Sequence, residues 1–261
     1  MDVIVNADDL GMNEAIDRAI LELIGKGLVT SASLLANGPS IESACASIHE
    51  YPSCSFGAHL NVTEFSPLSD PDNLRPILND QGDFAGEQIR DTEMTPGLAA
   101  GITNEFCSQI ERLLTLGAEV THIDSHHYIL NMRKMLPILK KVRSRFGIGR
   151  VRITRNIYAG DEEIGRVQKT KKSVYNFLIR HYVGAQTTDG FAGFDLFHAN
   201  AKSKRLKHRT FEALVHPGNP FYDEGEVETL LGPWRDELRV PVRFINDFHI
   251  NKFKCSEVSS S

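Results

Sequence analysis

The chain has 261 residues, and we expect a single α/β domain over residues 1–250 followed by a frayed polar tail at 251–261. Its 41% apolar and 24% charged residues are ordinary for a soluble globular protein. The net charge of -5 argues against nucleic acid as a partner, and no apolar run approaches membrane-spanning length. Without a basic leader segment, and with four scattered cysteines that form no CxxC pair, the sequence predicts a cytoplasmic protein that lacks a disulfide framework.

Short β-branched runs alternate with helical patterns through the first half of the chain. Residues 63–95, which are rich in Pro, Asp, Asn and Gly, predict a long loop, and loops of this length are usually functional or disordered. Strands are predicted at residues 2–7, 29–37, 54–62 and 119–124, and helices at residues 13–26, 40–50 and 97–116.

The same alternation continues in the second half. Repeated strand–helix units predict a parallel sheet, although periodicity alone does not distinguish a closed barrel from an open doubly wound sheet. The predicted elements are helices at residues 133–146, 168–183 and 226–238, and strands at residues 150–154, 211–216 and 242–246.

Acidic and histidine side chains gather where the predicted strands end. In parallel strand–helix folds, ligands bind at the carboxyl ends of the strands, so we expect these side chains to meet at one rim of the sheet. Four strands contribute such residues. The first strand is followed by Asp8 and Asp9, the third carries His59, the fourth carries or is followed by His122, Asp124, His126 and His127, and a late strand ends at His216.

The adjacent carboxylates Asp8 and Asp9 allow two interpretations. One of them could cap the next helix while the other stays solvated, although Asn13 is better placed for that cap. Two neighbouring carboxylates without a cation would raise one another's pKa through like-charge repulsion, and a bound divalent cation reverses that cost. The pair is therefore compatible with a helix cap or with a metal site.

The stretch THIDSHHYIL, residues 121–130, contains four titratable side chains within six residues. His122 and Asp124 share one side of an extended strand, and His126 or His127 follows at its mouth. Mixed Asp and His ligands suit a catalytic metal with an open water position, and His122 or Asp124 could orient a ligating histidine. His59 alone, between apolar residues, would more often be a packed core histidine.

Three later segments carry weaker signals. His216 precedes Pro217 and Gly218, and it is either a surface histidine in a turn or a general acid that titrates near neutral pH. The basic stretches KTKK at 169–172 and KSKRLKHR at 202–209 are interpreted as solvated faces. The glycine-flanked stretch TTDGFAGF, which contains Asp189, predicts a substrate-facing loop.

Six motifs occur in order along most of the chain: VNADDLG, VTSASLLAN, GAHLNVT, THIDSHH, TTDGFAG and LVHPG. Together they resemble the YdjC-like carbohydrate deacetylases, the family that includes the chitooligosaccharide deacetylase and hopanoid-associated branches. The resemblance implies an irregular TIM-type (β/α) barrel with seven to eight strands, and metal-dependent removal of N-acetyl groups from sugars. Many relatives read DSHHHVH in the fourth motif, whereas this chain reads DSHHYIL, which leaves the substrate open.

The resemblance also implies roles for individual residues. Asp8 corresponds to the general base and His216 to the proposed general acid. The implied metal ligands are Asp9, His59 and His126, with His127 as an alternative to His126. Weaker expectations of substrate binding or of support behind the ligands fall on His122, Asp124, His127 and Asp189.

The expected cofactor is one divalent metal ion, with Mg or Zn first and Mn or Co as alternatives. The expected partner is an N-acetylated sugar, and a homodimer is left open, whereas neither nucleic acid nor membrane insertion is expected. Two other functions stay open. One is a different metal-assisted hydrolase or isomerase acting on sugars or sugar phosphates, and the other is a non-catalytic carbohydrate-binding protein.

Overall fold

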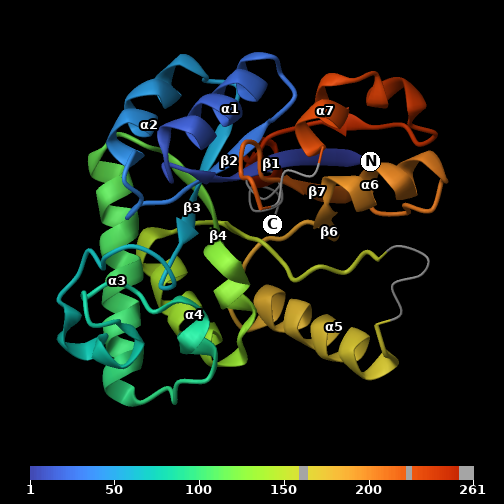
Figure 1. The fold of residues 1–261 in the computed structure, drawn as a ribbon. Coiled ribbons are helices and arrows are strands. Elements are labelled where there is room, and N and C mark those ends of the chain that lie inside the picture. Colours follow the sequence, from blue (N-terminus) through green and yellow to red (C-terminus); the bar gives the residue numbers. More distant parts are fainter. Residues whose placement is uncertain (159–163, 222–224, 253–261) are drawn as a thin grey trace, which may run out of the picture.

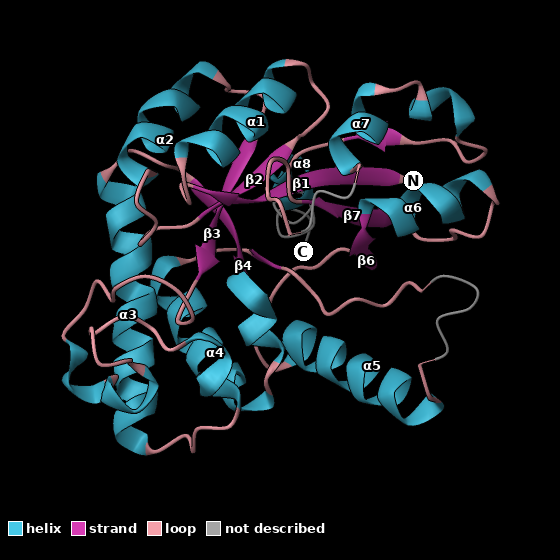
Figure 2. Ribbon diagram, viewed as in Figure 1, coloured by secondary structure: helices cyan, strands magenta, loops and turns pink. Residues whose placement is uncertain are grey.

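A computed structural model of the chain describes residues 1–158, 164–221 and 225–252, with strands at the centre and helices around them (Figures 1 and 2). The strands are β1 (Asp2–Leu10), β2 (Ser31–Leu34), β3 (Ser55–Leu60), β4 (Val120–Ser125), β5 (Arg150–Val151), β6 (Gly190–Gly193), β7 (Thr210–Val215) and β8 (Arg243–Phe244). The helices are α1 (Glu14–Gly25), α2 (Ile41–Ser47), α3 (Pro96–Thr115), α4 (Leu136–Phe146), α5 (Arg166–His181), α6 (Phe194–Lys202), α7 (Glu226–Leu231) and α8 (Asp247–Lys252).

The eight strands form one parallel sheet in the order β5–β4–β3–β2–β1–β7–β6, with β8 paired to the start of β1. The two edges of the sheet also approach one another, because Arg150 of β5 forms a parallel bridge with Gln186, shortly before β6. The sheet therefore curls into an irregular, partly closed barrel. The predicted (β/α) barrel of seven to eight strands is confirmed.

Helix α1 illustrates how the local sequence produces an element. Asn13 is extended, with φ of -167°, and its side-chain oxygen accepts hydrogen bonds from the backbone N–H groups of Ala15 and Ile16. This is a standard helix N-cap, so neither Asp8 nor Asp9 is needed for capping. The buried face carries apolar residues at helical spacing, namely Ile16, Ile20, Leu23 and Ile24.

The expected loop at residues 187–194 is wrong, because β6 occupies residues 190–193 and α6 follows it directly. The strand has the sequence GFAG, which is too short and too glycine-rich to show a strand pattern, yet it pairs with β7 along its whole length. Helix α6 is recognisable only from its buried face, in which Phe194 and Phe197 pack near Trp234.

The long segment at residues 63–95 is ordered and packs beside α3 (Figure 1). It contains three short 3-10 helices and buries apolar side chains of its own. The backbone N–H groups of Leu68 and Ser69 donate to the carboxylate of Glu105 on α3, and Lys134 donates to three backbone carbonyls of the segment. These contacts compensate for the lack of regular secondary structure.

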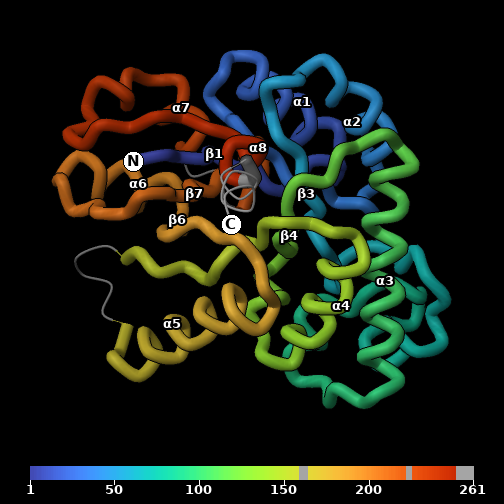
Figure 3. The backbone as a smooth tube through the Cα atoms, turned by 180° about the vertical axis from the view of Figure 1, so that it is seen from behind, coloured from blue at the N-terminus to red at the C-terminus, as the bar shows by residue number. Residues whose placement is uncertain are grey.

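β8 pairs with the start of β1, and Figures 2 and 3 show α8, which follows β8, beside β1. The Asp247 carboxylate at the start of α8 accepts hydrogen bonds from Ser31 and Ser55 and pairs with Arg150. Residues 253–261, most of the expected polar tail, lie outside the described residues, and the one-domain interpretation stays a prediction. Within the described parts of the chain, no helix is both long and apolar enough to cross a membrane.

Substitution of Gly57 tests the close approach of β3 to β4. A Cβ atom at this position would lie 2.3 Å from Nε2 of the fully buried His122, so Gly57→Ala should lower the free energy of unfolding by about 1–3 kcal/mol in urea denaturation. Gly165 has φ of -56° and no atom within 4 Å of a Cβ, so Gly165→Ala should change stability by less than about 0.5 kcal/mol. Equal losses in the two variants would contradict the packing argument.

Candidate active site

A β-bulge in β1 turns two adjacent carboxylates toward the barrel interior. In a regular strand, neighbouring side chains point to opposite faces. The register of β1 against β2 shifts between Ala7 and Leu10, and Asp9 has φ of 72°, in the left-handed region. This conformation costs about 1–3 kcal/mol in a residue other than Gly and clusters at functional sites. Both Asp8 and Asp9 are consequently buried, with carboxylate oxygens 3.9 and 3.3 Å from Nε2 of His59.

Asp9 lies at the centre of a group formed by three strand ends. Its Oδ1 is 3.3 Å from Nε2 of His59, in β3, and 2.9 Å from Nδ1 of His126, directly after β4. One donor atom from each residue lies within 4.8 Å of the others, and all three residues are buried. Asp9 Oδ1 and His126 Nε2 have no hydrogen-bond partner among the described residues. Because buried polar atoms are rarely left unsatisfied, this donor set fits a divalent cation.

The charges around this group also favour a cation. Burial raises the pKa of Asp9, but the neighbouring His126 and His59 rings outweigh it and hold that pKa well below its usual value. Burial lowers the pKa of His59, but the Asp124 and Asp8 carboxylates outweigh it and raise the pKa to about 10. The interior network contains two guanidinium groups against five carboxylates: Arg150 and Arg152 against Asp8, Asp9, Asp124, Glu212 and Asp247.

Asp124 contacts the far side of the His59 ring, away from Asp9. Its Oδ1 is hydrogen-bonded to Nδ1 of His59 at 2.7 Å, and its Oδ2 accepts from Ser33 at 2.6 Å. A carboxylate on the second ring nitrogen of a ligating histidine fixes the orientation of the ring and increases its basicity. His122 has a different place, because its ring packs against Gly57 and its Nδ1 lies 3.4 Å from Asp247. The structure thus brings Asp124, but not His122, into contact with His59 of the candidate donor set.

Asp8 is held in a fixed orientation beside Asp9. Arg152, which follows β5, donates to both Asp8 carboxylate oxygens at 2.7 Å, and Asn6 donates to Oδ1 at 2.8 Å. Oδ2 of Asp8 lies 4.0 Å from Nε2 of His216. Asp8 therefore stands between the ligand group and the histidine that follows β7.

His216 lies at the edge of the buried group, where it faces a cavity. Its backbone N–H donates to the carboxylate of Glu226 at 2.9 Å, which ties the end of β7 to the start of α7. Burial lowers the pKa of His216, although Asp8 and Asp9 act in the opposite direction. The neutral ring therefore predominates at neutral pH, and its protonated form is a stronger acid than an exposed imidazolium.

His127 and Tyr128 both have left-handed backbone conformations, with φ of 48° and 53°. The His127 ring stacks on His126 with 4.0 Å between centroids, and its Nδ1 lies 3.0 Å from the hydroxyl of Thr63. The geometry therefore favours His126 over His127 as the neighbour of Asp9. Glu64 lies outside this pair, with Oε2 at 3.4 Å from Nε2 of His126, and the sequence interpretation had not included it.

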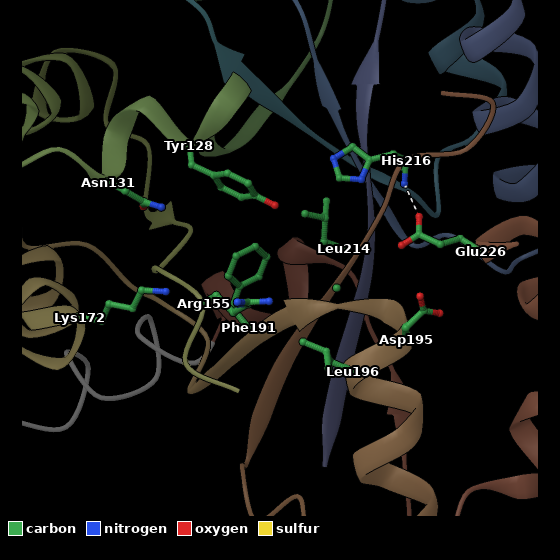
Figure 4. A pocket seen from close by; sticks show the side chains of 11 residues that line it. Tyr128, Asn131, Arg155, Lys172, Phe191, Asp195, Leu196, Leu214, His216 and Glu226 are labelled. Atoms are coloured by element: carbon green, nitrogen blue, oxygen red, sulfur yellow. Dashed lines mark hydrogen bonds between the residues drawn. The ribbon is translucent and has the colours of Figure 1, made fainter. Parts of the chain in front are cut away.

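A cavity of about 440 Å³ opens beside His216, and of the residues described above His216, Glu226 and Tyr128 line it. Figure 4 shows His216, Glu226 and Asp195 on one side and Tyr128, Asn131, Arg155 and Lys172 on the other. Apolar side chains lie between the two sides, namely Leu214, Phe191 and Leu196. A concave site with apolar walls and a few placed polar groups is typical of small-molecule binding.

Asp189 is not part of this arrangement. It directly precedes β6, at the amino-terminal end of the strand, and its Oδ2 accepts hydrogen bonds from the backbone N–H groups of Arg209 and Thr210. The expected substrate-facing position is wrong, because residues at the amino end of a parallel strand lie at the opposite rim from the site. Asp189 instead fixes the chain at the entrance to β7.

Arg152, Asn6 and Asn219 also belong to the site, and sequence reasoning missed all three. Asn219 donates to Oδ2 of Asp9 at 3.3 Å. The sequence contained one usable signal, because Arg150 and Arg152 are two residues apart in a predicted strand and so share one face. Two arginines on a buried face require carboxylate partners.

Comparisons with known proteins match the part of the chain that carries the six sequence motifs. The model of the family described as YdjC-like protein matches residues 2–240. The chain belongs to the YdjC-like family. It is 36% identical to a carbohydrate deacetylase of Geobacillus stearothermophilus, over 55% of this chain and 56% of that protein. It is 29% identical to a carbohydrate deacetylase of Clostridium beijerinckii, over 84% of this chain and 82% of that protein.

The similarities cover different shares of the chain. The chain spans little more than half the length of the Geobacillus relative, and 59% of a carbohydrate deacetylase of Listeria welshimeri, at 34% identity over 57% of this chain. The crystal structure of an Enterococcus faecalis V583 protein named for cellobiose-phosphate cleavage superposes with a TM-score of 0.77. It covers 95% of this chain and 98% of its own, at 19% identity, and thus shows the same fold.

Metal binding should stabilise the folded chain. A ligand at a hundred times its dissociation constant stabilises by about 2.7 kcal/mol, which corresponds to a rise in Tm of about 5–10 °C for a chain of this size. Differential scanning fluorimetry should show this rise when Zn or Mn is added to chelator-treated wild type. Asp9→Ala should remove the effect, whereas Asp189→Asn should keep it. A comparable rise in Asp9→Ala would contradict the assigned ligand group.

Metal binding should also release a proton. With a pKa of about 10, His59 is protonated in the metal-free chain at pH 7–8, and a ligating nitrogen must lose its proton. Calorimetric titration in two buffers with different ionisation enthalpies should therefore show about one proton released per metal ion. The apparent affinity should increase as the pH rises from 6 to 9, because the competing proton is lost. An affinity independent of pH would show that His59 is not a ligand.

Proposed function

We propose that this chain is a metal-dependent hydrolase that removes N-acetyl groups from an acetamido sugar or oligosaccharide. One observation carries the proposal: a buried metal donor set, a carboxylate and a histidine occupy successive positions, and the histidine lies at the wall of a cavity. The donor set is Asp9, His59 and His126, followed by Asp8 and then His216. Membership of the YdjC-like family and the relatives named carbohydrate deacetylase support the reaction class.

Asp9, His59 and His126 would hold one divalent ion. Mg and Zn are the first candidates, and Mn or Co is also compatible with one carboxylate and two imidazoles. Such an ion, when bound, polarises a carbonyl oxygen and lowers the pKa of water from 15.7 toward about 7. Asp124 keeps the ring of His59 in the orientation that presents Nε2 to the ion.

Asp8 is the proposed general base, which accepts the proton of the attacking water. The two hydrogen bonds from Arg152 fix its carboxylate plane, so the base needs little reorganisation when it reacts. Oδ2 faces both His59 and His216, which places the accepting atom between the ligand group and the leaving-group side of the cavity. Asn6 holds the other oxygen.

His216 is the proposed general acid, which donates a proton to the departing amine nitrogen. Its lowered pKa makes the protonated ring a stronger donor, and its position at the cavity wall allows contact with a bound sugar. Tyr128 faces it across the cavity and offers an aromatic face to the sugar ring (Figure 4).

The two alternative functions make different predictions about products. A metal-assisted hydrolase acting on sugar phosphates would release phosphate rather than acetate. A carbohydrate-binding protein would bind an acetamido sugar without releasing either product, and it would need neither Asp8 nor His216. Acetate release from a panel of N-acetylated sugars, with and without chelator, distinguishes all three.

Asp8→Asn should separate catalysis from metal binding. The amide keeps the shape of the carboxylate but cannot accept the proton, so kcat for acetate release should fall by about 10²–10⁴-fold. Metal content, measured by inductively coupled plasma mass spectrometry, should stay near that of wild type because Asp8 is outside the ligand group. Asp189→Asn is the matched control and should retain wild-type kcat. Full activity in Asp8→Asn would rule out the assignment of the base.

A further inference from the structure

Helix α5 exposes an apolar stripe along its outer face. Val167, Val174 and Phe177 are 70%, 43% and 57% exposed. Together with the exposed Thr170 and His181 they recur every three or four residues, so the five side chains lie along one line of the helix. The Thr170 hydroxyl donates to a backbone carbonyl of the preceding turn, and the His181 ring lies 4.2 Å from the Phe177 ring. These two residues therefore continue the stripe.

The opposite face of α5 packs on the rest of the protein. Its buried residues are Tyr175, Asn176 and Ile179, and the Asn176 side chain accepts hydrogen bonds from the backbone N–H and the hydroxyl of Thr154. Figures 1 and 3 both show α5 at the periphery of the molecule, and no other helix of the described residues is drawn over its outer side. The helix is thus anchored on one face, and its apolar stripe faces solvent.

Positive charge flanks the stripe on both sides. Helix α5 contains five Arg or Lys side chains and no Asp or Glu. At 3.6 residues per turn, Arg166 and Arg180 lie on one side of the stripe and Lys171 lies on the other. The whole chain has a net charge of -5, so α5 is a positive region on an acidic protein. The surface complementary to this face is apolar at its centre and anionic around it.

A second copy of the chain is a poor complement to this face. In a two-fold contact the same patch meets itself, so the cations of one α5 would oppose those of the other. Like charges that oppose one another across an interface cost free energy. An anionic lipid surface has neither problem, because it accepts apolar side chains at the boundary of the acyl chains and cations at the level of the phosphates.

We propose that α5 docks on an anionic lipid surface, with Val167, Val174 and Phe177 at the apolar boundary and the flanking Arg and Lys side chains among the phosphates. This inference goes beyond the proposed function and does not depend on it. Each Lys or Arg close to an anionic membrane increases partitioning about fivefold. Lys172, on the same helix, lines the active-site cavity. Docking would therefore hold that cavity about one helix diameter, about 10–12 Å, from the phosphates.

Co-sedimentation of the 261-residue chain with lipid vesicles tests the proposal. Wild type should partition at least about tenfold more strongly onto vesicles of equal parts phosphatidylglycerol and phosphatidylcholine than onto vesicles of phosphatidylcholine alone. An increase in NaCl from about 0.1 M to about 1 M should weaken this binding, because the Debye length falls from about 10 Å to about 3 Å. Equal partitioning onto the two kinds of vesicle would overturn the proposal.

Charge variants show whether α5 is the docking element. Arg166→Gln/Lys171→Gln should lower the partition coefficient at least about tenfold, because one cation is lost on each side of the stripe. Lys204→Gln/Lys207→Gln is the matched control: it removes the same charge from the exposed basic stretch at residues 202–209 and should bind as wild type does. Equal losses in the two double variants would assign the binding to general charge and contradict docking through α5.

The stripe itself is tested by Phe177→Ser. Because the Phe177 ring is 57% exposed, the change should preserve the fold, as circular dichroism can verify, and lower partitioning about fivefold. Unchanged binding would show that the stripe does not enter the interface. Sedimentation equilibrium without lipid examines the second copy as occupant. A wild-type dimer that Phe177→Asp dissociates would make this face a contact between copies, and the lipid proposal would be wrong.

Discussion

The buried guanidinium group of Arg152 connects three strands of the barrel through their carboxylates. It pairs with Asp8 of β1 at 2.7 Å, with Asp124 of β4 at 2.6 Å and with Glu212 of β7 at 2.5 Å. A buried charge costs several kcal/mol unless partners compensate for it, and removal of one partner leaves the others uncompensated. The positions of Asp8, the proposed general base, and of Asp124, behind His59, therefore depend on the same cation. The order of the donor set Asp9, His59 and His126 therefore depends on this network.

The buried carboxylates of this network outnumber its guanidinium groups. Arg150 and Arg152 pair with four carboxylates and Asp9 adds a fifth, so the interior carries excess negative charge even though two histidines beside it have raised pKa values. The left-handed conformation of Asp9 adds a backbone cost of about 1–3 kcal/mol. A divalent cation would offset both costs, since it would be attracted to the excess charge and would bind the oxygen that the bulge turns inward. Strain and charge thus point to the same ligand.

The sequence was sufficient to predict those parts of the site whose position follows from the topology of a parallel sheet. Polar residues at the ends of parallel strands must share a rim, which located Asp9, His59 and His216 without coordinates. The bulge was not predictable, because regular alternation would turn Asp8 and Asp9 to opposite faces. The error at Asp189 follows from the missed strand β6. A loop at residues 187–194 leaves Asp189 free to face the substrate, whereas a strand beginning at residue 190 places it at the opposite rim.

Tyr128 connects the departure from the family motif with the recognition of substrate. Its φ of 53° and that of His127 hold the segment after β4 in a conformation that non-glycine residues seldom adopt, and the Tyr128 ring is 43% exposed beside the cavity. In the motif that resembles the family's DSHHHVH, Tyr128 offers an aromatic face, so under the proposed function the change would alter contact with the sugar ring and leave Asp9, His59 and His126 in place. Tyr128 lies on the same side of the cavity as Lys172 and Arg155, opposite His216 (Figure 4). Under the proposed function, one side of the cavity would therefore vary with the substrate while the opposite side keeps His216, the proposed general acid.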